Sequence, residues 1–415
     1  QQYGLGADLQ QIRQIRNSFL DVMYRDENMT LGYWETKYKG IQYVESILAD
    51  PMGKGLQDSM NQFWDSWQEL SKEPESLTMR AMVRQRAETL LSTINHMDSQ
   101  LDKLTTDLSS EIGVRVKEVN QITSQIAQLN NVIYKQEASG GTANDYRDQR
   151  NLLADRLTSL VNADVTETLE GQLFITIGGY PIVNRDKSVN LYMEKAKQGR
   201  LSHTPLLGED GIKAPLNDGS IKGLMDSVEE VENIRGMLNN LVNTMAEEVN
   251  QLHRSGKTAG KPPKDGEDFF VKVKTGGPFS MGNIKLNDNL KDLNNIVVSK
   301  LDSSGDNTVA KEIASLRNKP VINDKTGLLS IDEYYESIIL KVGQSGNEAF
   351  NIAENQRKLV QAADANRQSL SGVSLDEEMA NMMKYKFAYD ASSRAFNTID
   401  EMIDTLINRM GIVGR

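Results

Sequence analysis

The sequence predicts a mainly α-helical protein of the α+β kind: an elongated helical bundle built from discontinuous segments, an inserted β-rich domain, and a terminal coiled-coil helix. Three observations predict this fold. A long stretch without proline carries apolar residues three and four positions apart, which is the spacing of one helix face. A middle segment changes to alternating apolar and polar residues punctuated by glycine. The end of the chain returns to a heptad pattern.

Composition excludes several classes of function. The 415 residues suffice for two or three domains, and an aromatic content of only 6% favours elongated helical packing over one thick core. The formal net charge of −11 is spread along the chain, so we expect no groove for nucleic acid. No apolar run reaches the roughly 18 residues of a membrane span, and residues 1–20 lack the apolar core of a signal peptide.

Cysteine is absent. Its absence excludes disulfides, thiolate catalysis and cysteine-ligated zinc. It fits an ordinary cytosolic protein, and it equally fits a protein that is exported unfolded, in which stray thiols are a hazard. Composition does not separate these two interpretations.

The first helices carry regular apolar stripes. Residues 8–48 are predicted to form one helix that ends at Asp50-Pro51, and residues 56–71 form a short second helix. Residues 144–161 form another helix after a glycine-containing turn. Together with the long helix between them, these segments make residues 1–163 the N-terminal part of the helical bundle.

The longest predicted helix runs from Leu77 to Ala138, with no proline and the single glycine Gly113. Residues 87–138 alone would span about 78 Å at ~1.5 Å per residue. A compact globule of this chain length has a radius of gyration of only about 22 Å. The sequence therefore predicts a rod-like part, unless Gly113 breaks the helix into a hairpin.

The remaining chain alternates between helical and strand-like patterns. Short strands with Gly and Pro punctuation are expected from Asp164, and their period of two and the flanking helices predict a small core of their own. The boundaries we assign are 164–220 for the inserted β-rich domain, 221–256 for the middle of the bundle, 257–306 for a loop and strand segment of the same β-rich domain, 307–370 for the C-terminal part of the bundle, and 371–415 for the terminal helix.

The terminal helix carries a nearly uninterrupted apolar seam. Its members step by three and four residues, which is the signature of a coiled coil, and a helix with such a seam needs a partner helix. That partner belongs either to the chain's own bundle or to another molecule, so we expect the function to lie in assembly. The assembly seam comprises Leu375, Met379, Met382, Tyr385, Tyr389, Phe396, Ile399, Ile403, Leu406 and Met410.

Chemistry-bearing constellations are missing from the sequence. His96, His203 and His253 lie far apart without helical i,i+4 pairing, so no metal site is expected. The acidic loop at 302–306 has its glycine in the wrong place for calcium. No Walker or nucleophile-elbow motif occurs. We therefore expect no enzyme activity, no catalytic residues and no cofactor.

Four segments, in chain order, carry a family resemblance. The first comprises Gly4-Leu5-Gly6-Ala7, Ile12, Arg16, Phe19-Leu20 and Arg25. The second is Ala143-Asn144-Asp145-Tyr146-Arg147-Asp148-Gln149-Arg150-Asn151. The third is Val249-Asn250-Gln251-Leu252-His253-Arg254-Ser255-Gly256, followed by Gly266-Glu267-Asp268-Phe269-Phe270. The fourth is Ser371-Gly372-Val373-Ser374-Leu375-Asp376-Glu377-Glu378.

Together these segments resemble the hook-associated protein 1 family of bacterial flagella, the first hook–filament junction proteins. Asn151 and Ser374 stand where that family usually has Asp and Asn. The match begins inside the family's pattern, so the resemblance implies that the family's N-terminal segment is missing. The positions carried over as structural are Asn144, Asp145, Arg150, Asn250, His253, Asp376, Glu377 and Glu378.

The resemblance implies a structural axial protein that self-assembles through its helical domains and terminal coiled coil. Its implied partners are the hook protein, the second hook–filament junction protein, further copies of itself in a ring, and a cytosolic flagellar export chaperone that holds the terminal helix. Neither nucleic acid nor membrane is implied. The implied location is extracellular, on the flagellum, after type III export without a cleaved signal peptide.

Other interpretations stay open at this stage. Asn144-Asp145 can be an ordinary helix N-cap, and Asp376, Glu377 and Glu378 can be acidic residues favoured at a helix start. The whole chain can be a flagellin or a second junction protein, which share the terminal-helix arrangement. From other classes come a cytosolic coiled-coil signalling protein and an enzyme or sugar-binding β domain.

Overall fold

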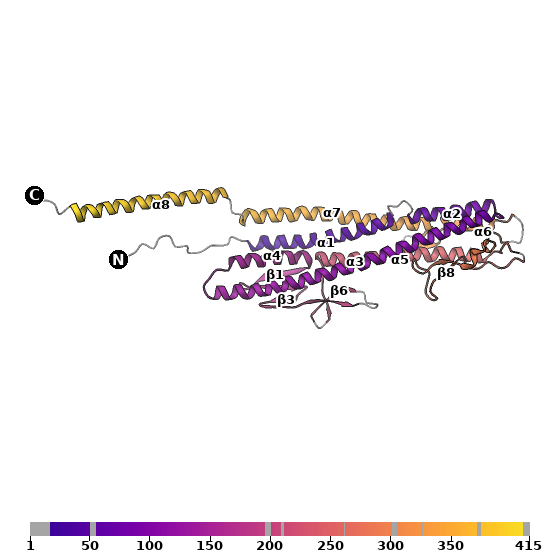
Figure 1. Ribbon diagram of the computed structural model, residues 1–415, viewed down its shortest axis with the longest axis horizontal. Helices are drawn as coiled ribbons and strands as arrows, with labels where there is room; N and C mark the ends of the chain where they lie inside the picture. Colours follow the sequence, from indigo (N-terminus) through magenta and orange to yellow (C-terminus); the bar gives the residue numbers. More distant parts are fainter. Residues whose placement is uncertain are drawn as a thin grey trace, which may run out of the picture. The chain divides into compact units, whose positions relative to one another are not determined.

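The computed structural model of the protein describes residues 17–49, 55–195, 201–208, 211–260, 262–300, 305–324, 327–371 and 375–409 (Figure 1). By its internal contacts the chain divides into two compact units. The larger unit is Arg25–Val360, which we call the body. The smaller unit combines Gln1–Tyr24 with Gln361–Arg415.

Helices dominate the body. Most of them begin and end close to the predicted positions, but the helix predicted over residues 8–48 begins only at Ser18. The helices that lie wholly or partly in it are α1 (Ser18–Ala49), α2 (Leu56–Lys72), α3 (Leu77–Ala138), α4 (Asn144–Leu160), α5 (Gly219–Arg254), α6 (Thr308–Ser315) and α7 (Ile331–Ser371). The first part of α1 and the last part of α7 belong to the smaller unit.

Helix α3 is the longest element of the body. It is one helix of 62 residues, about 93 Å long at ~1.5 Å per residue. It continues through Gly113, which is buried, so the hairpin alternative is not realised. At its start Ser76 caps the helix, because its Oγ accepts a hydrogen bond from the backbone N–H of Met79. The predicted rod-like part therefore exists within the body.

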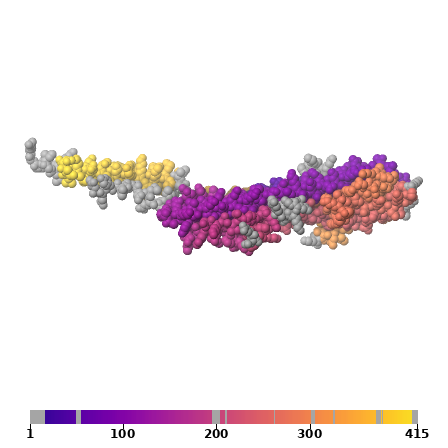
Figure 2. All heavy atoms as spheres, turned by 60° about the horizontal axis from the view of Figure 1, so that its bottom comes forward, coloured from indigo at the N-terminus to yellow at the C-terminus, as the bar shows by residue number. Residues whose placement is uncertain are grey.

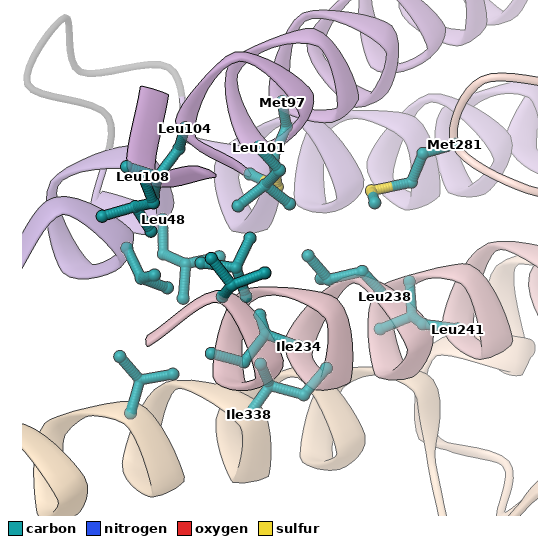
Figure 3. Close-up of a cluster of buried hydrophobic side chains, with 14 of the residues drawn as sticks. Leu48, Met97, Leu101, Leu104, Leu108, Ile234, Leu238, Leu241, Met281 and Ile338 are labelled. Atoms are coloured by element: carbon teal, nitrogen blue, oxygen red, sulfur yellow. The ribbon is translucent and has the colours of Figure 1, made fainter. Parts of the chain in front are cut away.

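The apolar stripe of α3 forms one wall of the hydrophobic core, and α2, α4 and α5 pack against this helix. Leu90, Ile94 and Leu101 are fully buried, and each such side chain contributes about 1.5–3 kcal/mol. Where α1, α3, α5 and α7 meet, the core comprises Leu48, Met97, Leu101, Leu104, Leu108, Ile234, Leu238, Leu241, Met281 and Ile338 (Figure 3).

The β-rich segment forms two small antiparallel sheets. The first has the order β1 (Ala163–Glu167), β2 (Leu173–Ile177), β3 (Tyr180–Asn184) and β4 (Lys187–Ser188). The second has the order β5 (Leu191–Lys195), β6 (Leu201–Leu207) and β7 (Ile212–Lys213). Strands of both sheets contact α3, and in the space-filling view the magenta of this segment lies directly against the purple of α3 (Figure 2).

The prediction that this segment has a core of its own is wrong. Leu173, Ile175 and Ile177 on β2 are buried, and they belong to the same hydrophobic cluster as the apolar residues of α3. Small sheets such as these are stable when their apolar face packs against another element, for example a helix. The apolar face of the sheets is instead covered by the long helix, and the segment is part of the body.

The assignment of 257–306 to the same β-rich domain is also wrong. Strands β8 (Phe270–Val271) and β9 (Lys285–Leu286) form a separate sheet, toward the opposite end of α3 from β1 and β3 (Figure 1). Aromatic packing holds them there: the rings of Phe269 and Trp67 of α2 lie 5.4 Å apart, and those of Phe270 and Phe63 lie 6.0 Å apart.

Short elements complete this end of the body. The 3₁₀ turns Asp288–Lys291 and Leu293–Asn295 follow β9, and the turn Leu316–Asn318 follows α6. The hairpin of β10 (Ile322–Asp324) and β11 (Gly327–Leu329) then leads into α7.

The smaller unit contains α8 (Leu375–Asp404), which continues into a π-helical turn, Thr405–Arg409. Within the same unit, Arg367 of α7 lies 4.0 Å from the ring centre of Tyr24 and 3.7 Å from a carboxylate oxygen of Asp21 on α1. These contacts join the start of α1 to the end of α7.

Candidate assembly surface

The seam of α8 is exposed along its whole described length. The exposed fraction ranges from 46% at Ile403 to 75% at Tyr389. The described members are Met379, Met382, Tyr385, Tyr389, Phe396, Ile399, Ile403 and Leu406, all of them exposed. Met410 and the side chain of Leu375 lie outside the described residues. Within the part of the chain that the structure describes, nothing covers this seam.

The acidic residues of the fourth motif lie in the first turn of α8, as expected for a helix start. Asp376 and Glu378 are exposed, and the side chain of Glu377 lies outside the described residues. The first-motif residues before Asn17 and the glycine-containing segment 372–374 also lie outside them. From the first motif, Arg25 is buried, and its Nε donates to Asp155 of α4 at 2.7 Å.

Residues of the second motif divide between the surface and the interior. Asn144 and Asp145 begin α4, but the N-cap is Ala143 and it makes no side-chain cap bond, so the N-cap expectation for Asn144 is wrong. Arg150 is only 1% exposed. Its Nη1 donates to Asn130 Oδ1 at 3.0 Å and to the carbonyl of Gly171 at 2.7 Å, and its Nη2 donates to Glu167 at 3.0 Å. Arg150 therefore fastens α4 to α3 and to the turn between β1 and β2.

Burial lowers the pKa of the Arg150 guanidinium, and the carboxylate of Glu167 opposes this shift. Nearby, Arg147 donates to Glu137 of α3 at 2.7 Å. Its hydrogen bond holds the pKa of Glu137 below the usual range. These charges are engaged in contacts between elements and point to a structural role.

Three asparagines on the helices act as strand partners. Asn130 Nδ2 donates to the carbonyl of Leu173 at 2.8 Å, and its Oδ1 accepts the N–H of the same residue at 2.9 Å. Asn120 pairs in the same way with Leu191, and Asn250 with Phe270. A side-chain amide satisfies both backbone groups of one strand residue, which would otherwise be buried and unpaired.

The sequence identified Asn250 through the third motif but missed Asn120 and Asn130. The signal that could have found Asn130 is an asparagine on the buried stripe of a long helix, where an apolar residue is expected. Asn120 is only half-buried and gives a weaker signal. Such a residue needs a partner, and the partner here is the edge of a sheet.

His253 is fully buried and makes two backbone contacts. Val297 N–H donates to its Nε2 at 3.0 Å, so Nδ1 carries the proton and donates to the carbonyl of Glu267 at 2.5 Å. Burial lowers the pKa of His253 to about 4. The neutral ring thus ties α5 to two separate points of the 257–306 segment.

Glycines of the third motif allow this close approach. A Cβ on Gly256 would lie 2.3 Å from the carbonyl oxygen of Ser299, and one on Gly266 would lie 2.0 Å from that of His253. Backbone atoms cannot move aside cheaply, so only glycine fits at either position. Asn250, His253 and these glycines form one structural latch between α5 and the 257–306 segment.

The body also contains a groove of about 700 Å³ beside the end of α5. Three of its charged groups have partners: Arg254 pairs with Asp268, and Lys272 donates to the carbonyl of Gly277 at 2.6 Å. Among the described residues, no group of three His, Cys, Asp or Glu side chains could hold a metal ion. No helix in this part of the chain has the length and hydropathy to cross a membrane.

Comparison with known proteins gives consistent matches along the chain. Residues 41–270 match the family described as "Flagellar hook-associated protein FlgK helical domain". Residues 367–410, which include all of α8, match the family described as "Flagellar basal body rod FlgEFG protein C-terminal".

Individual proteins match over nearly the full chain. This chain is 30% identical to flagellar hook-associated protein 1 of Bacillus subtilis, and the match covers 100% of this chain and 88% of the relative. It is 22% identical to flagellar hook-associated protein 1 of Salmonella typhimurium over 98% of this chain and 90% of the relative. A solved structure, the flagellar hook junction protein FlgK from Burkholderia pseudomallei, has the same fold, with a TM-score of 0.72 and 13% identity over 86% of this chain and 100% of that one.

Proposed function

Because this chain belongs to the flagellar hook-associated protein 1 family, structural proteins of the hook–filament junction, we propose that α8 is the element through which it assembles there. The observation that carries the proposal is the contrast between body and tail. The body buries its apolar stripes in one continuous core. The seam of α8 keeps large apolar side chains in water.

An exposed seam of this size indicates a missing partner. Contiguous exposed apolar surface marks interaction sites, and an isolated helix without tertiary packing is only marginally stable in water. In the junction the partner is a helix of the same or a neighbouring copy, so that copies form a ring. The match of residues 367–410 to a C-terminal family of flagellar rod proteins supports α8 as the assembly element.

The specific partners that we propose are the hook protein on one side and the second junction protein on the other. Before assembly, a cytosolic export chaperone covers α8, and the type III apparatus exports the chain without a cleaved signal peptide. Exposed apolar residues at the end of a chain without cysteine support this order of events. The protein then acts outside the cell, on the flagellum, as a structural component and without enzyme activity or a cofactor.

The test replaces three seam residues by aspartate: Phe396→Asp, Ile403→Asp and Leu406→Asp. All three side chains are exposed. The free energy of unfolding of the body, measured by thermal melting, should therefore stay within about 0.5 kcal/mol of the value for the parent. Chaperone capture in a pull-down and filament attachment on isolated hooks should both be lost. A charge-matched control, Arg394→Asp with Asn397→Asp, places the same added negative charge off the seam and should retain both.

Two outcomes would refute this role for α8. If the triple variant unfolded the body, the seam would be an ordinary core element. If it still supported attached filaments, the junction would be built through another surface.

A further inference from the structure

The turn between β1 and β2 carries an apolar side chain that lies wholly in water. Leu169 is fully exposed. Its neighbour Glu170 is also exposed, without an ion-pair partner among the described residues. Single exposed apolar residues are common on protein surfaces and need no explanation. Leu169 differs from these because the turn that presents it is fastened on several sides.

Contacts within the body hold this turn in one shape. The N–H of Gly171 donates to the carbonyl of Thr168 at 2.9 Å, and Arg150 donates to the carbonyl of Gly171 at 2.7 Å. Gly171 has a φ of +73°, and a Cβ at this position would lie 2.4 Å from a side-chain nitrogen of Arg147. A side chain presented by such a preorganised turn loses little freedom when a partner binds it. Leu169 is therefore suited to insertion into another surface.

A groove between α1 and α7 has room for one such side chain. Its lining includes Tyr38 of α1 and Phe350 of α7, whose ring centres lie 5.3 Å apart, and the buried Ala353. Phe350 is 45% exposed. The groove has a volume of about 160 Å³, and an apolar cavity of about 150 Å³ can hold a benzene ring. Because Leu169 is fully exposed, it does not fill the groove of its own copy.

The charges around this groove complement those of the turn. Three of the rim residues pair with one another: Arg357 lies 2.8 Å from Glu35 and 2.7 Å from Glu354. Lys39, also on the rim, is exposed and has no ion-pair partner within the described part of the chain. The turn offers Glu170 directly beside its exposed leucine. A free cation beside the apolar groove and a free anion beside the apolar side chain favour one register of contact.

One chain thus carries both halves of a contact, on two different surfaces of its body. Such a contact is heterologous: each copy gives its turn to one neighbour and receives the turn of another, and the series forms a ring where the rotation closes. One leucine and one ion pair bury far less than the roughly 1,200 Å² of a stable interface. The contact therefore does not join free copies, and it forms only where neighbours are already held side by side.

We propose that, within the assembled junction, the β1–β2 turn of each copy inserts Leu169 into the α1–α7 groove of the next copy, with Glu170 against Lys39. The occupant of the groove is the turn of a second copy. This contact rests on the proposed function, because neighbouring bodies meet only in the ring that α8 builds. It determines which faces of neighbouring bodies touch.

The first experiment uses the natural absence of cysteine. The protein with both Glu170→Cys and Lys39→Cys is expressed in place of the parent, and isolated hooks that carry the junction are treated with a short bis-maleimide. A ladder of linked copies is expected on a denaturing gel. Each single variant should stay unlinked, because residue 170 meets residue 39 and not itself. The free double variant at micromolar concentration should also stay unlinked.

Four outcomes would overturn the proposal. Junctions that contain the double variant and attach filaments could give no ladder, which would leave the assembly role of α8 intact. The other three are a ladder from Glu170→Cys alone, linked copies of the free double variant, and a product that joins the turn to a different protein. If the parent protein were absent from isolated hooks, the role of α8 and this contact would both fall.

The second experiment measures the fraction of filaments that stay attached after a fixed shear. Leu169→Asp should lower this fraction several-fold, whereas Leu328→Asp, at an exposed leucine toward the other end of the body, should not. Glu170→Lys and Lys39→Glu should each lower it, and the two changes together should restore it. Equal losses from the two leucine variants, or no restoration in the double variant, would overturn the proposal. All four residues are exposed, and melting of the body verifies that each variant remains folded.

Discussion

Acidification should destabilise the body through His253. In the folded protein the pKa of this histidine is about 4, against 6.5 for an unperturbed side chain. Between these values the unfolded chain binds more protons than the folded one, so stability falls as the pH falls from 6.5 to 4. At roughly 1.36 kcal/mol per pKa unit, the full loss is about 3 kcal/mol. This loss of stability is complete below pH 4, and it is absent above pH 6.5, the pKa of the histidine in the unfolded chain.

The contacts of His253 explain why protonation of its ring is unfavourable in the folded protein. A charged ring would lose the acceptor at Nε2 and leave the Val297 N–H unpaired in the interior. The buried guanidinium of Arg80 also lowers the pKa of His253, while Glu267 and Asp268 act in the opposite direction and less strongly than burial. Arg254, the partner of Asp268, lies at the same end of α5.

Urea unfolding of the parent and of His253→Gln at a series of pH values measures this effect. Fluorescence of Trp67, which packs on Phe269 next to the histidine, reports the transition. The variant should be less stable at pH 7, because it loses one of the two backbone contacts. The parent's free energy of unfolding should fall by about 3 kcal/mol relative to that of the variant when the pH is lowered to 4. His96→Gln, at an exposed position, serves as the matched control. If the curves of parent and His253→Gln ran parallel over this range, the reasoning would be refuted.

Three further results are expected. Arg150→Met should cost about 1–3 kcal/mol of folding stability, because the carbonyl of Gly171 loses the buried donor that pairs with it. The exposed Arg156→Met should cost about 0.2–1 kcal/mol, and equal costs in denaturant titrations would contradict this. Gly256→Ala should lower the melting temperature more than Gly260→Ala, because only the first meets backbone at 2.3 Å; the reverse order would exclude the latch. Deleting residues 163–213 should abolish the cooperative melt of the body, because the sheets cover part of its core, and an unchanged calorimetric transition would mean that the strands form an independent domain after all.

The helices and the seam could be predicted from the sequence because their signals are local. A helix of any length repeats the same i to i−4 hydrogen bond, so apolar spacing predicts α3, and the breakers at Ser139–Gly141 place its C-terminal end. The exposed seam of α8 follows from the same heptad spacing. Family motifs added His253 and Arg150, although the sequence alone did not give the contacts they make.

Tertiary structure decided which elements share a core. The alternation in 164–220 predicted strands, but it carries no information about what covers their apolar face, and the cover is α3, distant along the chain. Phe269 and Phe270 joined the 257–306 segment to α2 rather than to the other strands, because ring packing depends on residues about two hundred positions away. The side-chain amides of Asn120 and Asn130 find hydrogen-bond partners only when the edge of a strand lies beside them. The sequence by itself therefore determined the period of each element, and long-range contacts between buried groups determined where each element lies.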